Sequence, residues 1–242
     1  GTLTVNARSL GSGTGYTAGI AVGQPAAETY DGAAHTPAPT VTDSTIQVNS
    51  ADKVLVSGTD YALTYTGNIH AGTAVITVTG KGNYTGTITR SFEILQKDVT
   101  LTAGSTTRAY NGTALTNRTC APAEGSALAP GDSIDASSVT CSGTILDVGS
   151  VPNAITAVVI RNGAGTDVTA DYNITKTAGT LAVTPIASVI TITASSSARV
   201  YNGAALTAGY TYTQGVLLAG DTLTAVVSGS QTNAGSSANT VT

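Results

Sequence analysis

The side chains that could carry acid–base or nucleophilic chemistry are few and scattered in this chain. Its two histidines, His35 and His70, have no pattern of acids or cysteines around them, so we expect surface or turn residues. No Gly-x-Ser-x-Gly elbow lies between a predicted strand and a predicted helix. Residues 11–15 are glycine-rich, but neither a lysine nor a helix pattern follows them, as phosphate binding at a helix N-terminus would require. We therefore predict no catalytic residue, no cofactor and no enzyme activity.

Oxygen ligands for a hard cation are the next candidates. Asn162, Asp167 and Asp171 could gather around Ca²⁺, which prefers carboxylate and carbonyl oxygens. The chain has no Asp-x-Asp-x-Asp-Gly loop, and the same residue types are typical of turns, where their side chains bind nearby backbone. The turn interpretation is favoured, and no metal site is predicted.

Cys120 and Cys141 are the only two cysteines, and they flank one stretch of the chain. They are either two reduced, half-buried thiols or a disulfide. The composition is typical of a secreted protein, where disulfides persist, so the disulfide is favoured. Closing a loop of about 20 residues would stabilise the fold by roughly 3 kcal/mol in the chain-entropy model. No histidine lies near the pair, which makes it a poor metal site.

Composition limits the partners. Charged residues make up 10% of the chain, against a usual level of roughly a quarter. The net charge is −4, and the lysines and arginines form no cluster that could follow a phosphate backbone, which argues against nucleic acid. No apolar run approaches the ~18–20 residues of a membrane span, so no membrane insertion is expected in this segment.

A short motif recurs along the chain and sets its organisation. It occurs as Tyr30-Asp31-Gly32, Tyr110-Asn111-Gly112 and Tyr201-Asn202-Gly203. Each copy is followed by small residues and then a threonine. The spacing is too long for a solenoid unit and suits one small domain repeated in tandem. We expect a turn in which the glycine takes a positive φ and the tyrosine packs at the end of its domain.

The elements between the motif copies have the two-residue period of β-strands. Residues 73–79 form the clearest example, with Ala74, Ile76 and Val78 on one face. Residues 60–65 alternate in the same way, and residues 84–94 are predicted as one strand. Helical spacing of apolar residues never persists for three turns. Short strands separated by Gly and Asn turns predict an all-β protein of tandem small β-sandwich, Ig-like domains in an elongated rod.

The repeats divide the chain into four parts. We assign residues 1–8 to the closing strand of a preceding repeat, 9–96 to domain 1, 97–186 to domain 2 and 187–242 to an incomplete domain 3. The first assignment rests on the match of Gly1-Thr2-Leu3-Thr4-Val5 to Gly179-Thr180-Leu181-Ala182-Val183, which closes domain 2. Domain 3 lacks a counterpart of roughly residues 157–185.

Two interpretations of the ends stay open. The chain is either a window into a longer array or a complete subunit whose residues 2–5 complete the third domain of a neighbour. The second would give a head-to-tail filament. The window is favoured, because one strand of about five residues does not replace the whole of the segment that domain 3 lacks.

Several segments resemble the mostly-β, glycine-rich repeats known as MBG or YDG domains. The segments are Tyr30-Asp31-Gly32, Gly58-Thr59-Asp60-Tyr61, Ala71-Gly72-Thr73-Ala74, Gly80-Lys81-Gly82-Asn83-Tyr84-Thr85-Gly86, Gly131-Asp132, residues 167–174 and residues 179–183. The resemblance covers nearly the whole chain. It implies a non-catalytic stalk or filament segment of a large bacterial surface protein or adhesin, located outside the cell. Its motif residues are turn formers and core tyrosines, with no catalytic residue to carry over.

The expected partners are neighbouring repeats, or identical subunits joined head to tail. An alternative is an adhesive module that presents tyrosines to a host or cell-surface glycan or protein. The tyrosines considered for it are Tyr16, Tyr61, Tyr65, Tyr84, Tyr210 and Tyr212. Three of them, Tyr61, Tyr65 and Tyr84, lie on predicted core faces, which favours the stalk.

Overall fold

The computed structural model describes residues 1–11, 16–17, 19–215 and 217–242. In this part of the chain the backbone forms strands and two single-turn 3₁₀ helices, so the predicted all-β class is confirmed. The glycine-rich turn predicted over residues 11–15 lies, apart from Gly11, outside the described residues. No helix in these ranges is long and apolar enough to cross a membrane.

Contacts group the chain into two compact units. The first contains Gly1–Gly104, Arg118–Ser142 and Ala154–Gly179, and the second contains Ser105–Asn117, Gly143–Asn153 and Thr180–Thr242. We call the predicted domains 1, 2 and 3 repeat one (residues 9–96), repeat two (97–186) and repeat three (187–242). The first unit holds repeat one and part of repeat two, and the second holds the remainder of repeat two together with repeat three.

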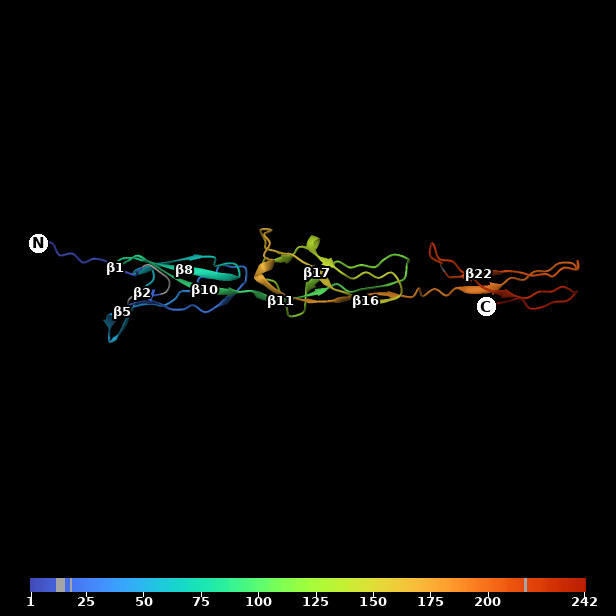
Figure 1. Cartoon of the computed structure of the whole chain (residues 1–242), viewed down its shortest axis with the longest axis horizontal. Helices are drawn as coiled ribbons and strands as arrows, with labels where there is room; N and C mark the ends of the chain where they lie inside the picture. Colours follow the sequence, from blue (N-terminus) through green and yellow to red (C-terminus); the bar gives the residue numbers. More distant parts are fainter. Residues whose placement is uncertain (12–15, 18, 216) are drawn as a thin grey trace. The chain divides into compact units, whose positions relative to one another are not determined.

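The strands of repeat one all belong to the first unit. They are β1 (Arg8–Ser9), β2 (Tyr16–Thr17), β3 (Ile20–Val22), β4 (Glu28–Thr29), β5 (Val41–Val48), β6 (Ala51–Val54), β7 (Tyr61–Thr66), β8 (Gly72–Gly80), β9 (Tyr84–Thr85) and β10 (Thr87–Leu95). Two four-stranded sheets, ordered β4-β10-β8-β7 and β2-β3-β5-β6, contribute side chains to one buried cluster. In the first sheet β8 and β10 lie side by side (Figure 1), with Ala74 opposite Phe92.

Strand β8 follows its prediction closely. Ala74, Ile76 and Val78 are all fully buried, because the two-residue period places them together on the core face.

The single strand predicted over residues 84–94 is wrong in one respect. It divides into β9 and β10 at Gly86, whose φ of 80° is incompatible with an extended strand.

The part of repeat two in the first unit continues the same core. Its elements are β11 (Lys97–Ala103), β13 (Cys120–Pro122), β14 (Ser133–Ile134), η1 (Ala136–Ser138), β15 (Thr140–Cys141), β17 (Ile155–Ala157), β18 (Ile160–Arg161), η2 (Thr169–Asp171) and β19 (Tyr172–Thr177). β11 pairs antiparallel with β13 and parallel with β19. Val99, Leu101 and Tyr172 belong to the same buried cluster as Ile76 and Phe92 of repeat one.

The second unit has its own smaller core. Its strands are β12 (Thr106–Ala109), β16 (Gly149–Asn153), β20 (Gly179–Thr184), β21 (Thr191–Ala194), β22 (Tyr210–Gln214), β23 (Val227–Ser228) and β24 (Thr240–Val241). β20 lies between β12 and β16 and pairs with β12 in parallel. Its Leu181 and Val183 are buried with Leu115. In repeat three β21 pairs antiparallel with β22, as β11 does with β13.

Candidate functional site

The recurrent motif forms the same turn three times. The φ of its glycine is 83° at Gly32, 75° at Gly112 and 77° at Gly203, which confirms the predicted positive φ. The side-chain Oδ1 of the middle residue accepts a hydrogen bond from the backbone N–H two residues later, at 2.8 Å in Asp31, 3.1 Å in Asn111 and 3.1 Å in Asn202. These bonds are Asx turns, so the Asp and Gly of the motif shape the backbone.

The motif tyrosines differ in their surroundings. Tyr30 is 2% exposed, Tyr110 is half-buried beside the Leu115–Leu181 cluster, and Tyr201 is 64% exposed. The prediction that the motif tyrosine packs at the end of its domain is therefore confirmed for Tyr30 and is wrong for Tyr201.

Tyr30 of repeat one packs on an acidic residue of repeat two, and both belong to the first unit. Its hydroxyl donates a 3.0 Å hydrogen bond to Oδ2 of Asp132, and the hydroxyl of Tyr172 donates a 2.6 Å bond to the same oxygen. The backbone N–H of Ala129 donates in turn to the Tyr172 hydroxyl, at 2.8 Å. The Tyr30 and Tyr172 rings meet edge to face with centroids 5.5 Å apart, a preferred aromatic geometry.

A second acidic residue completes this contact. Asp171 is 4% exposed, and its Oδ2 lies 2.8 Å from Nδ1 of His70. The backbone N–H of Ala71 donates to Oδ1 of Asp171, also at 2.8 Å. The His70 ring stacks on Tyr30 with centroids 6.4 Å apart. We refer to Tyr30, His70, Asp132, Asp171 and Tyr172 as the inter-repeat joint.

The electrostatics of the joint keep its hydroxyls protonated. Burial first, and then the hydrogen bond to Asp132, raise the pKa of Tyr30 well above its ordinary value. Burial first, and then the hydrogen bond to Asp132, also raise the pKa of Tyr172. Both tyrosines therefore remain neutral hydrogen-bond donors at physiological pH. This arrangement can hold two repeats together, but it offers no activated nucleophile.

The candidate ligands for a cation serve other roles. Asn162 Oδ1 accepts from the N–H groups of Ala164 and Thr166, and Asp167 Oδ1 accepts from that of Thr169. Asp171 belongs to the joint. In the described ranges no three His, Cys, Asp or Glu side chains are grouped as a metal site would need. The oxygens considered for Ca²⁺ therefore cap turns or join repeats.

Cys120 on β13 and Cys141 on β15 are both half-buried, free thiols that pack on the same core. Burial first, and then the neighbouring Cys141 thiol, raise the pKa of Cys120. The structure thus contains the reduced pair, and the disulfide stays a prediction.

A buried carboxylate in repeat one was not anticipated from the sequence. Asp43 is fully buried and lies 2.8 Å from Nε of Arg8. Thr45 donates to it through its N–H and its hydroxyl, and the Tyr84 hydroxyl donates to it at 3.3 Å. Burial alone would raise the pKa of Asp43, but the Thr45 hydrogen bonds and the Arg8 charge outweigh burial, so the pKa lies below its ordinary value. This cluster is structural, because its donors already bind the carboxylate.

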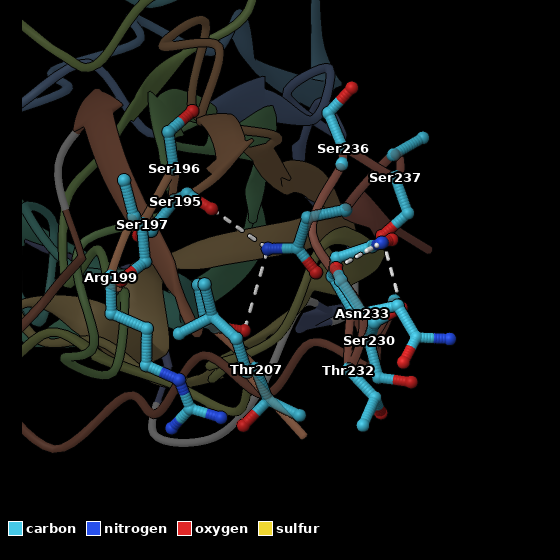
Figure 2. A pocket seen from close by; sticks show the side chains of 18 of the residues that line it. Ser195, Ser196, Ser197, Arg199, Thr207, Ser230, Thr232, Asn233, Ser236 and Ser237 are labelled. Carbon is cyan, nitrogen blue, oxygen red and sulfur yellow. Dashed lines mark hydrogen bonds between the residues drawn. The ribbon is translucent and has the colours of Figure 1, made fainter. Parts of the chain in front are cut away.

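Repeat three contains a groove of about 630 Å³. It is lined by residues 194–199 with Tyr201, residues 206–208 and residues 229–239. Figure 2 shows Ser195, Ser196, Ser197 and Arg199 along one side and Ser230, Asn233, Ser236 and Ser237 along the other. All of these residues belong to the second unit.

The two sides of this groove correspond to the strands that flank β20 in repeat two. One side aligns with β12, because Arg199 and Tyr201 repeat Arg108 and Tyr110. The other side aligns with β16, because the backbone bridge between Leu206 and Gln231 repeats the one between Leu115 and Ile145. The groove therefore lies at the position that β20 occupies in repeat two.

An asparagine marks the same correspondence. In repeat two, Asn153 Nδ2 donates to the Asn117 carbonyl, and its Oδ1 accepts from the Gly143 N–H at 3.1 Å. In repeat three, Asn239 Nδ2 donates to the Ser195 carbonyl at 2.8 Å. Its Oδ1 is buried and accepts no hydrogen bond within the described part of the chain. Buried acceptors are normally satisfied, so the two asparagines differ in this one hydrogen bond.

Comparison of the chain with protein-family models, with curated proteins and with solved structures gives no match.

Proposed function

We propose that this chain is a structural, non-catalytic stalk segment of a secreted or surface-anchored bacterial protein of the adhesin type. In this proposal its repeats are small β-sandwich domains of the MBG/YDG kind, arranged in tandem as an elongated rod outside the cell. The two four-stranded sheets of repeat one, which share one buried cluster, support the sandwich part of the proposal.

The inter-repeat joint is the observation that carries the proposal. A stalk needs junctions that resist bending, and flexible polar linkers do not provide them. Here the junction contains buried aromatic rings and a carboxylate that accepts two tyrosine hydroxyls. Both hydrogen bonds are part-buried and charge-assisted, and such bonds are directional and stronger than neutral ones. The joint can therefore fix repeat one against the adjoining part of repeat two.

The adhesive-module alternative has less support. Of the tyrosines considered for a binding surface, Tyr61 and Tyr84 are buried and Tyr65 is half-buried. Tyr212 on β22 is half exposed, but no cluster of exposed aromatic rings surrounds it in the described residues. A glycan array with the whole chain tests this alternative. Specific, saturable binding there would favour the adhesive function over the stalk.

Small-angle X-ray scattering tests the stalk function itself. The wild-type chain should give a sharply defined maximum dimension that fits an extended particle. Asp132→Ala should broaden the distance distribution, because it removes the acceptor shared by Tyr30 and Tyr172. Asp147→Ala is the matched control, since Asp147 is exposed and lies outside the joint. A compact wild-type particle would contradict the proposed stalk.

A further inference from the structure

We propose that Asn111, the middle residue of the second motif copy, deamidates without an enzyme and becomes aspartate. The product has the Tyr-Asp-Gly sequence that the first copy already has. Asp31 of the first copy accepts a hydrogen bond from the Ala33 N–H, just as Asn111 accepts one from the Thr113 N–H. The same turn therefore accommodates either side chain. The proposal concerns the covalent chemistry of the chain and does not rest on the stalk function.

The reaction uses only the turn and water. Hydroxide removes the proton from the backbone nitrogen of Gly112, and this nitrogen then bonds to Cγ of Asn111. The Cγ–Nδ2 bond breaks, and the side-chain nitrogen takes a proton from water and leaves as ammonia. Water next opens the cyclic imide, so the net reaction consumes water, releases ammonia and oxidises nothing. Opening at Cγ gives aspartate, whereas opening at the main-chain carbonyl gives isoaspartate, which lengthens the backbone.

The structure folds the Asn111 side chain over the peptide bond that reacts. Oδ1 of Asn111 lies 3.1 Å from the backbone nitrogen of Thr113, and this Asx turn spans the Asn111–Gly112 peptide. Gly112 has no Cβ that would obstruct the approach of its nitrogen. Asn111 and Gly112 are both exposed, and neither forms a backbone–backbone hydrogen bond in the described ranges. Ring closure therefore breaks no such bond.

Two donors bind the oxygen that becomes negative when the ring closes. Oδ1 of Asn111 accepts from the Thr113 N–H and, at 2.9 Å, from the Thr113 hydroxyl. The guanidinium of Arg108 donates to the same hydroxyl oxygen at 3.1 Å. Donors already in place around a developing oxyanion stabilise the transition state. Arg108 also provides a positive charge close to the carboxylate of the product.

The other two Asn-Gly pairs of the chain should react more slowly. Asn202 forms the same turn, but its Oδ1 accepts from the N–H of Ala204, which has no hydroxyl to donate. Asn162 also has two donors to its Oδ1 but is half-buried. Its own N–H and carbonyl are hydrogen-bonded within residues 162–166, which holds its backbone against ring closure. The expected order is Asn111, then Asn202, then Asn162.

Peptide mapping by mass spectrometry tests this order in the whole folded chain. Trypsin cleaves after arginine and lysine, which places the three asparagines in separate peptides. During incubation in mildly alkaline buffer, the peptide with Asn111 should be the first to gain the mass difference between an amide and a carboxylic acid. The peptide with Asn202 should follow, and the one with Asn162 should stay unchanged longest.

A reciprocal exchange of residues tests the role of the threonine hydroxyl. Thr113→Ala should slow the conversion of Asn111 to the rate of Asn202, because it leaves the backbone N–H as the remaining donor. Ala204→Thr should speed the conversion of Asn202 toward the rate of Asn111. Both positions are exposed, so neither change disturbs a buried core.

The same chain unfolded in urea is the control for the dipeptide sequence itself. There the three Asn-Gly pairs should convert at similar rates, since the turns are lost. An Asn111 that keeps its amide in the folded chain while the unfolded chain reacts would overturn the proposal. Equal rates at the three sites in the folded chain, or a Thr113→Ala variant that reacts as fast as the wild type, would overturn it as well.

Discussion

The hydroxyl of Tyr30 donates a 3.0 Å hydrogen bond to Oδ2 of Asp132, 102 residues further along the chain. This bond ties the Tyr-Asp-Gly turn of repeat one to the Gly-Asp loop of repeat two. The first copy of the recurrent motif, Tyr30-Asp31-Gly32, therefore has two structural functions. Asp31 and Gly32 shape the turn, and Tyr30 joins the repeat to the next one.

Replacement of Asp132 by alanine should destabilise the first unit. The change leaves two buried tyrosine hydroxyls without their acceptor, and each unsatisfied group costs about 1–3 kcal/mol. Urea unfolding followed by circular dichroism should show a lower midpoint. Asp147→Ala, at an exposed position, should change the midpoint little. Equal shifts of the urea midpoint in Asp132→Ala and Asp147→Ala would show that the hydrogen bonds to Asp132 do not stabilise the first unit.

Gly112→Val should destabilise the second unit. Gly112 has a φ of 75°, and a β-branched residue there is strained by about 1–3 kcal/mol. Gly209→Val is the matched control, because a Cβ at Gly209 meets no atom within 4 Å and its φ is not positive. Hydrogen exchange read by mass spectrometry should show faster exchange around residues 105–117 in Gly112→Val alone. Similar exchange in both variants would mean that the turn does not need glycine.

Oxidation should link Cys120 to Cys141. Both thiols are half-buried on one core, and an oxidising environment favours the bond. Intact mass after air oxidation should fall by two hydrogen atoms, and reduction should restore it. The disulfide should stabilise the fold by roughly 3 kcal/mol in the chain-entropy model. An unchanged mass under an excess of oxidised glutathione would show that the thiols cannot meet.

Stability should fall in acid partly through Asp135. Hydrogen bonds from Ser137 first, and from Arg161 next, lower the pKa of Asp135 from 3.8 to about 2. The unfolded chain therefore binds this proton at a higher pH than the folded chain, so the stabilisation is complete above pH 3.8 and is lost as the pH falls to about 2. Asp135→Asn keeps an N-cap acceptor for Ser137 but has no charge to titrate. Its stability should depend less steeply on pH in this range, and a slope equal to that of the wild type would contradict this assignment.

Local patterns predicted much of the fold. The period of β8 placed Ala74, Ile76 and Val78 in the core, and the Tyr-x-Gly copies predicted three positive-φ glycines. Both features depend on residues close in sequence, where sterics decide the backbone. The break between β9 and β10 was missed because Gly86 fits an alternating pattern as well as it fits a bend.

The joint could not be predicted from the sequence. Asp132 follows Gly131, and this pair of residue types is typical of an ordinary turn. His70 lies in a predicted loop with no acidic residue next to it in the sequence. Their partners, Tyr30 and Asp171, lie about 100 residues away. Hydrogen bonds between residues so far apart in sequence depend on how the repeats pack. The spacing of neighbouring residues carries no information about that packing. The sequence holds one signal for this loop: Leu128-Ala129-Pro130-Gly131-Asp132 of repeat two recurs in repeat three as Leu218-Ala219-Gly220-Asp221. That recurrence indicates a role common to both repeats, but it does not identify Tyr30 as the partner.

A double-mutant cycle between Tyr30→Phe and Asp132→Ala tests the central claim most directly. The claim is that Tyr30 and Asp132 join repeat one to repeat two through a direct, part-buried hydrogen bond. Urea unfolding of the wild type, the two single variants and the double variant gives their coupling free energy. We predict a coupling of about 0.5–3 kcal/mol, as for residues in contact within one hydrogen-bond network. Effects that add to within about 0.3–0.5 kcal/mol, as for independent sites, would contradict the joint.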